Sequence, residues 1–206
     1  MQDLSDLSAK KRRDILDAAL QEFLDKGFSQ ARMDCISSRA AVSKRTVYKH
    51  FDSKDKLFHA IVDILAERIA DELDIDYDPE RPIRDQLVDI GWAEGRLFMD
   101  DQIIAMFRMI IAEAMRAPEL AAGLQNKFDK TRSIAQLMQA AVDDGSLRMA
   151  APQVAAEQFL AMLKARAFWP AILGAGLVTK AELSEIIEAA ADVILACYGT
   201  PETSRD

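Results

Sequence analysis

The sequence predicts an all-α protein with a small N-terminal domain that holds a helix-turn-helix, followed by a larger helical bundle. Apolar residues recur three and four positions apart through most of the 206 residues, as on the buried face of a helix. Glycine occurs only eight times, and no strand-like alternation of apolar and polar residues persists. We expect about nine helices, in domains at 1–56 and 57–199, and a disordered tail at 200–206.

The first third of the chain is predicted to form four helices. The first ends at Gly27, since glycine commonly terminates helices. The fourth begins after Asp52 or Ser53, either of which can cap its N-terminus, and it belongs partly to each domain. The expected ranges are 8–26, about 33–40, about 44–50 and 53–74.

The remainder is predicted to form five further helices. The acidic stretch IDYDPERP at 75–82 contains two prolines and is expected to be a linker. DDGSL at 143–147 is expected to be a loop in which Gly145 stops a helix, and Thr179 with Glu182 forms a capping box. The expected ranges are 83–99, 102–115, 118–143, 152–173 and 180–198.

The charge distribution indicates which end of the chain suits an anionic partner. The formal net charge is −8. Residues 1–60 hold 12 Lys and Arg against 9 Asp and Glu, whereas residues 61–206 hold 14 against 25. Phosphates respond to the local field within roughly 8–10 Å and not to the total charge. The basic N-terminal part is therefore compatible with nucleic acid.

Composition also limits the location and the chemistry of the chain. The apolar runs are too short to span a membrane, and the polar start MQDLSDLSAKKRRD lacks the apolar core of a signal peptide, so a cytoplasmic location is expected. Cys35 and Cys197 follow no pairing or metal-ligand spacing and are interpreted as small buried apolar residues. No cofactor or metal is expected.

The pair of short helices within 33–58 carries the strongest functional signal. In the second of them, called here the reader helix, Val47 and Phe51 are four positions apart and form the buried side. Most of its other residues are cationic, hydroxylated or aromatic, the types that bond phosphates and base edges. This pattern favours binding of duplex DNA. The plainer alternative is a structural hairpin whose charges are only solvated.

The stretch from about residue 10 to 62 resembles the N-terminal domain of the tetracycline-repressor (TetR) family. The matching residues are Ile15-Leu16-Asp17-Ala18-Ala19, Gly27-Phe28, Ile36, Val42-Ser43, Thr46-Val47-Tyr48, His50-Phe51 and Ser53-Lys54-Asp55-Lys56-Leu57. More loosely, RMIIAEAMRAPEL at 108–120 and the later AAEQFLAMLKARAFWPAILG resemble the C-terminal domain of AefR-like members.

The chemistry of the reader helix, supported by this resemblance, predicts its DNA contacts. Ser43 would cap the helix, Arg45 would form a bidentate contact with guanine, and Thr46 would touch a thymine methyl group or a phosphate. His50 is left open between a phosphate contact and a structural role. The full predicted set is Arg32, Ser43, Lys44, Arg45, Thr46, Tyr48, Lys49, His50 and Lys54.

Two positions depart from the family pattern. Members usually carry Thr or Ser just before the first helix of the motif, where this chain has Ala31 and Arg32. Arg32 can supply a charged phosphate contact, but neither residue has a hydroxyl group with which to cap the helix. The usual turn glycine is Ala41, so the turn either avoids a positive φ or accepts strain.

The acidic half contains most of the large flexible apolar side chains, and ordinary core is the first interpretation of each. The resemblance implies a cavity here for a small molecule, and adaptable methionines suit one. The predicted ligand-binding set is Trp92, Arg96, Phe107, Arg108, Phe159, Met162 and Trp169.

The last two helices are expected to form a homodimer interface, as the resemblance implies, because their faces are rich in alanine and aliphatic residues. The alternative is that both faces belong to the core of one subunit. The residues are Val154, Ala155, Phe159, Leu160, Leu163 and Ala167 on one helix, and Leu183, Ile186, Ile187, Ala190, Ala191 and Ile194 on the other.

The expected function is regulation of transcription. The resemblance implies a repressor that binds a palindromic operator as a homodimer and is released by a small apolar effector. The alternative keeps DNA binding but gives the C-terminal domain only dimerisation or a protein partner. An enzyme is not expected, because the chain offers two histidines without metal-ligand spacing, no Gly-rich phosphate loop and no nucleophile elbow.

Overall fold

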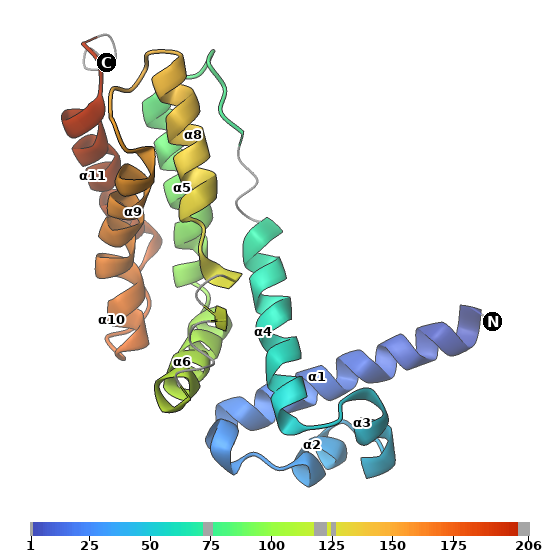
Figure 1. Ribbon diagram of the computed structural model, residues 1–206. Helices are drawn as coiled ribbons and strands as arrows, with labels where there is room; N and C mark the ends of the chain where they lie inside the picture. The colour runs from blue at the N-terminus through green and yellow to red at the C-terminus, as the bar shows by residue number, and fades with distance from the viewer. Residues whose placement is uncertain (1, 72–75, 118–122, 125–126, 202–206) are drawn as a thin grey trace. The chain divides into compact units, whose positions relative to one another are not determined.

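The computed structural model describes residues 2–71, 76–117, 123–124 and 127–201 (Figure 1). Over these residues it contains helices and no strand, which confirms the all-α prediction. None of the described helices combines the length and the apolar composition that a bilayer crossing needs. The chain divides into two compact units, each described by itself below. The N-terminal unit holds the residues up to Glu67 with Ala105–Lys127, and the C-terminal unit holds Arg68–Ile104 with the residues from Phe128 onward.

The N-terminal unit is built on the first four helices. The first begins earlier than expected and is broken at Gly27, whose φ of 74° lies outside the helical region. Ser53 Oγ accepts the Lys56 N–H at 3.2 Å, which confirms a cap at the start of the fourth helix. The helices are α1 (Gln2–Gln30), α2 (Met33–Arg39), α3 (Lys44–His50) and α4 (Lys54–Asp71).

The core of the N-terminal unit forms around the buried face of α1. Ile15 is fully buried, and Phe23 meets Phe28 and Phe58 with ring centres 5.4 and 6.4 Å apart. Phe28 and Phe58 also meet edge to face at 5.0 Å. This aromatic cluster fixes the turn after Gly27 against the start of α4.

The C-terminal unit contains a bundle in which α8 packs on α9, and α11 packs on both α5 and α9 (Figure 1). The capping box of Thr179 and Glu182 at the start of α11 is confirmed, and Gly145, with φ 89°, lies in the turn after α8. The helices after α4 are α5 (Ile83–Phe98), α6 (Asp101–Arg116), α8 (Thr131–Asp143), α9 (Pro152–Leu163), η1 (Lys164–Phe168), α10 (Trp169–Ile172) and α11 (Lys180–Tyr198).

Two glycines bring α5 and α11 together. A Cβ atom added at Gly91 would meet Ile187 Cγ2 at 2.5 Å, and one added at Gly95 would meet Leu183 Cδ1 at 2.7 Å. Neither position leaves room for a methyl group without movement of α11 or its side chains. A methyl group at Gly91 would meet the branched carbons of Ile187, whereas one at Gly95 would meet mainly the terminal methyl groups of Leu183.

The prediction of a single helix over 118–143 is wrong. The structure leaves Asp129 and Lys130 outside any helix and starts α8 at Thr131. Asp129 Oδ1 accepts the backbone N–H of Thr131 at 2.9 Å, so a short polar side chain replaces a helical hydrogen bond and begins a new helix. Residues 118–122 and 125–126 lie outside the described part of the chain.

The helix expected over 152–173 is confirmed in extent, but it is not regular. α9, η1 and α10 follow one another without a break, and the middle segment, η1, is a π-helix of five residues. Pro170 stands just after it and has no N–H to donate to the preceding turn. Counted as one helix, this segment brings the described helices to nine.

The prediction that the named residues of the last two helices form the homodimer interface is wrong. Ala155, Phe159, Leu163, Leu183 and Ile187 are all fully buried within one subunit. Except for Val154, the other members of the predicted faces are buried as well, so these faces form the subunit's own core. Apolar periodicity shows that a face is buried but not which chain buries it.

Both cysteines are exposed, and the prediction that they are buried is wrong. Cys35 precedes the buried Ile36 on the outer side of α2, and Cys197 follows the last buried residue of α11, Ile194.

Candidate DNA-binding interface

The reader helix α3 begins with a side-chain cap. Ser43 has extended backbone angles, and its Oγ accepts the N–H of Thr46 at 3.1 Å. The hydroxyl groups of Ser43 and Thr46 are also hydrogen-bonded at 2.8 Å. The predicted cap is therefore present in the structure, and it orders the first turn of α3.

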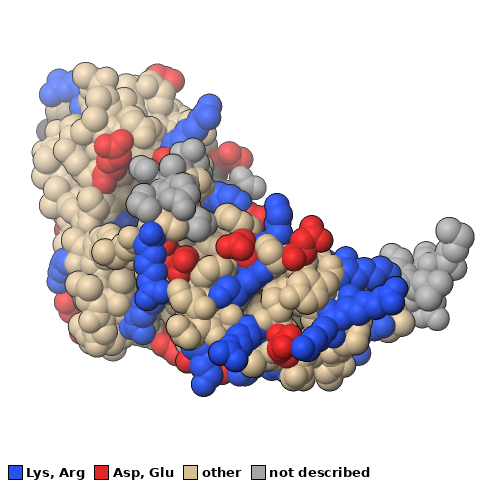
Figure 2. All heavy atoms as spheres, turned by 60° about the horizontal axis from the view of Figure 1, so that its bottom comes forward, with Lys and Arg blue, Asp and Glu red and all other residues tan. Residues whose placement is uncertain are grey.

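α3 is attached to the unit by its apolar side and exposes the opposite side. Val47 is fully buried and Phe51 is 5 % exposed. Arg45 and Lys49 are exposed and Tyr48 is 49 % exposed, while Thr46 and His50 are half-buried. Figure 2 turns this part of the N-terminal unit toward the reader and shows Lys and Arg side chains spread over it.

The turn between α2 and α3 keeps a left-handed residue although it lacks glycine. Ala41 has φ 51°, so of the two possibilities raised by the sequence the turn accepts strain. The N–H of Ala41 donates to Ser38 O and that of Val42 donates to Ser37 O, at 3.2 and 3.1 Å. These two bonds close the turn and set the direction of α3.

The start of α2 has no side-chain cap. Arg32 occupies the cap position with extended backbone angles, and its side chain makes no capping hydrogen bond. Asp34, in the first turn of α2, forms an exposed ion pair of 2.6 Å with Lys44 of α3. Such a pair contributes little to stability, and a phosphate can compete with Asp34 for Lys44.

Lys54 is occupied within the protein. Its Nζ donates to the carbonyl oxygens of Phe28, Ser29 and Ala31 at 2.6, 3.0 and 3.2 Å, and lies 4.6 Å from the centre of the Phe28 ring. An ammonium group has three donors, and all three are used here. We therefore leave Lys54 out of the DNA contacts that we propose below.

Arg39 was not singled out from the sequence, yet it joins α2 to α1. Its guanidinium lies 2.7 Å from Asp25 and 3.4 Å from Glu22, which is 5 % exposed. A buried glutamate on α1 and an arginine seventeen positions away have no sequence spacing that links them, so only the fold pairs them.

The residues predicted to bind a ligand do not form one lining. Phe107 and Arg108 belong to the N-terminal unit, and the other five belong to the C-terminal unit. Arg108 borders a groove of about 370 Å³ with Phe23, Phe28 and Met109. In the C-terminal unit Phe159 is fully buried, whereas Trp169 is 48 % exposed. Trp92 and Met162 are half-buried, and Arg96 is exposed.

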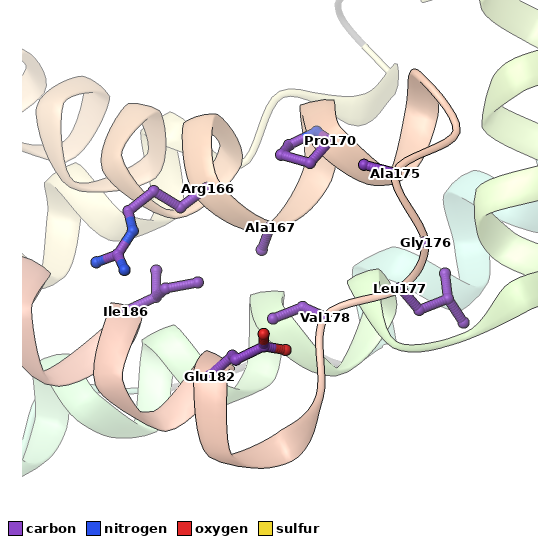
Figure 3. Close-up of a pocket in the computed structure, with 9 residues that line it drawn as sticks. All are labelled: Arg166, Ala167, Pro170, Ala175, Gly176, Leu177, Val178, Glu182 and Ile186. Carbon is purple, nitrogen blue, oxygen red and sulfur yellow. The ribbon is translucent and has the colours of Figure 1, made fainter.

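The C-terminal unit contains a groove of about 200 Å³. Figure 3 shows the residues that line it. Ala167 and Pro170 border it from one side, and Glu182 and Ile186 of α11 from the other. This volume is below the roughly 300–1,000 Å³ of typical ligand pockets. None of the predicted ligand residues lines it.

Glu94, a carboxylate buried in α5, was not predicted as a functional residue. Glu94 is 4 % exposed, its Oε1 lies 3.7 Å from Lys164 Nζ, and its Oε2 has no hydrogen-bond partner among the described residues. Burial raises the pKa of Glu94, and the charge of Lys164 opposes that rise. The spacing of Leu87, Ile90, Glu94 and Leu97 does hold the signal, because it places Glu94 in an apolar stripe.

A capped, cationic helix, held outward by a buried valine and joined to a second helix by a tight turn, defines a helix-turn-helix DNA-binding regulator. Residues 15–61 match the model of the tetR family of bacterial regulatory proteins. Residues 85–200 match that of the AefR-like transcriptional repressor C-terminal domain. The chain belongs to the TetR family of transcriptional regulators.

Individual relatives agree with this assignment. The chain is 32 % identical over 150 residues to the HTH-type transcriptional regulator UidR of Escherichia coli K12, covering 66 % of this chain and 68 % of UidR. A TetR family regulator from Pseudomonas syringae is 35 % identical, with a TM-score of 0.80, covering 93 % and 98 % of the two chains. The flavonoid-responsive regulator FrrA is 27 % identical, with a TM-score of 0.74, covering 94 % and 99 %.

Proposed function

We propose that the protein is a repressor that binds a palindromic operator as a homodimer and leaves it when a small molecule binds the C-terminal unit. The exposed cationic side of α3, fixed by Val47, carries the proposal. Repression is supported by the description of the matching C-terminal domain as a repressor domain.

The proposed DNA contacts follow from the order of residues along α3. Arg45, in the first turn, reaches into the major groove and reads a guanine. Tyr48 and Lys49 bind phosphate on the exposed side, as does Lys44 when it leaves Asp34. Arg32, Ser43, Thr46 and His50 complete the set, with Thr46 and His50 restricted by partial burial.

Homodimer formation is proposed through the outward faces of α9 and α11, because their inward faces are the core of one subunit. Val154 on α9 and Val193 on α11 are 46 % and 47 % exposed, although both are aliphatic. A two-fold dimer would place two reader helices about 34–36 Å apart, one turn of the double helix. This spacing is the physical reason for a palindromic operator.

Release by a small molecule is proposed for the C-terminal unit. FrrA, a similar protein, is described as flavonoid-responsive, which supports a small aromatic effector. The Oε2 atom of Glu94 is a buried acceptor with no hydrogen-bond partner among the described residues, and the π-helix that carries Lys164 lies beside Glu94. π-Helical turns occur frequently at functional sites. An effector displaces the protein from DNA only if it binds the released state more tightly.

The test recovers genomic fragments bound by the purified protein and determines the shared sequence and the number of subunits for each site. We expect an inverted repeat and two subunits. A monomer on a single half-site would contradict the dimer. Addition of flavonoids to the complex then tests release, with thermal shift as a second measure of binding. A protein that neither dissociates nor gains stability with any aromatic compound would favour a C-terminal unit that serves dimerisation alone.

A further inference from the structure

Four consecutive cations, Lys10 to Arg13, lie on α1 ahead of its buried face. That face begins at Ile15, so the preceding turns extend beyond the core of the N-terminal unit. Three of the four side chains are exposed, and Lys11 is half-buried. Figure 2 shows Lys and Arg side chains gathered on this face of the N-terminal unit. Residues 10–13 are called the basic segment below.

Arg12 attaches the basic segment to the reader helix. Its guanidinium carbon lies 5.2 Å from the centre of the Phe51 ring, a cation–π contact. Phe51 is the C-terminal cap residue of α3, and Lys49 and His50 occupy the last turn of that helix. The basic segment therefore continues the cationic surface of α3 on a second, rigid helix.

The other three cations of the segment have no carboxylate partner in the described part of the chain. Asp14 and Asp17 follow Lys10 and Arg13 by four positions, a spacing that permits ion pairs, but neither pair closes to 4.0 Å. Arg39 in the same unit, by contrast, lies 2.7 Å from Asp25. A solvated run of charge is the ordinary interpretation of such residues. The contact of the neighbouring Arg12 with Phe51, at the end of α3, gives these cations a specific place.

We propose that the basic segment binds the phosphates of the DNA strand flanking the base pairs that α3 reads. This proposal rests on the DNA-binding function proposed above. Arg12 positions the segment, and Lys10, Lys11 and Arg13 supply the contacts. Phosphates are the same in every sequence, so the segment adds affinity and sets the orientation on DNA without choosing bases.

The test is the variant K10Q/K11Q/R13Q, which keeps Arg12 on Phe51. Its affinity for the selected operator and for a random fragment is measured at several salt concentrations. The slope of log K against log salt concentration is negative, and each lost phosphate contact reduces its magnitude by about 0.9. We expect the magnitude of the slope to decrease by about 1–3 for each subunit, and the affinity for both fragments to fall roughly tenfold or more at low salt. The selected sequence should not change.

Two controls keep this result specific. Lys26→Gln removes an exposed cation from α1 beyond its buried face and should leave the slope unchanged. K10R/K11R/R13K keeps all charges and should restore the wild-type slope. A wild-type slope in K10Q/K11Q/R13Q would overturn the proposal. So would a loss of self-association without DNA, since the segment would then bind a second copy. If the wild-type protein bound no DNA, the proposed function itself would fail.

Discussion

Helices α3 and α5 use charged residues in opposite ways. α3 buries Val47 and exposes Arg45, whereas α5 buries Glu94 and exposes Arg96. The first arrangement offers charge to a partner that arrives from solvent. The second keeps a carboxylate in an apolar environment with one oxygen, Oε2, lacking a hydrogen-bond partner among the described residues, which is unfavourable. A surface for recognition can thus be read from residue types, whereas an internal site depends on what packs around it.

The largest expected effect is on base recognition by α3. Arg45→Ala removes the proposed bidentate contact and should weaken operator binding by about 1–3 kcal/mol, with relaxed preference at one position of each half-site. Binding titrations on the operator and on single-base variants measure this. An unchanged preference would assign guanine recognition to another residue.

Tyr48→Phe is the matched comparison on the same helix. It removes one exposed hydroxyl and keeps the ring, so phosphate binding should weaken on all sequences about equally. The same titrations, with random DNA added, separate the two variants. A loss confined to the operator would show that Tyr48 contacts a base.

The packing of α5 on α11 comes next. Gly91→Ala places a methyl group 2.5 Å from Cγ2 of the stiff, β-branched Ile187. The clash costs about 1–3 kcal/mol, more than the roughly 0.5–1 kcal/mol that alanine contributes in a helix interior. Unfolding in urea, followed by tryptophan fluorescence, should shift to lower denaturant.

Gly95→Ala is the control for this change. Its methyl group would meet the far end of Leu183, which can rotate away, so the two contributions should nearly cancel. An equal loss of stability in both variants would mean that the helices cannot adjust at either site.

The charge of Glu94 has a smaller, pH-dependent effect. Burial raises its pKa above the ordinary 4.5, so the folded protein holds the proton more tightly than the unfolded chain. Protonated Glu94 therefore favours folding, and that contribution is lost as pH rises through the folded pKa. Glu94→Gln should be more stable than the wild type by about 1–2 kcal/mol at high pH, with the difference vanishing toward pH 4.5.

Urea unfolding of the wild type and Glu94→Gln from pH 4.5 to high pH tests the sign of this pH dependence. Contributions of other titrating groups cancel when the two stabilities are subtracted. A difference that does not vary with pH would show that Glu94 keeps its ordinary pKa.

The smallest expected effect concerns the turn before α3. Ala41→Gly relieves the positive φ of 51° and should stabilise the N-terminal unit by about 1 kcal/mol. Ala40, with φ −76°, gains nothing from glycine, and Ala40→Gly should destabilise by about 0.5–1 kcal/mol. Thermal unfolding of the two variants compares neighbouring alanines with opposite backbone requirements.

Much of the reader helix could be predicted because its determinants are local. The cap of Ser43, the burial of Val47 and the exposure of Tyr48 follow from positions within two turns of one helix. Capping hydrogen bonds and apolar periodicity involve residues only a few positions apart, so they can be predicted from the order of residues. Most helix ranges and the capping box of Thr179 could be predicted for the same reason.

The tertiary structure decided whatever depends on residues far apart in the chain. Lys54 was predicted to bind phosphate, but in the fold its Nζ donates to the carbonyl of Phe28, twenty-six positions away. The apolar faces of α9 and α11 proved to be the core of one subunit, and Glu94 met Lys164 across seventy positions. Sequence fixes the polarity of each helix face, but only packing determines which surface meets it, because burial and electrostatic interaction depend on distance in space.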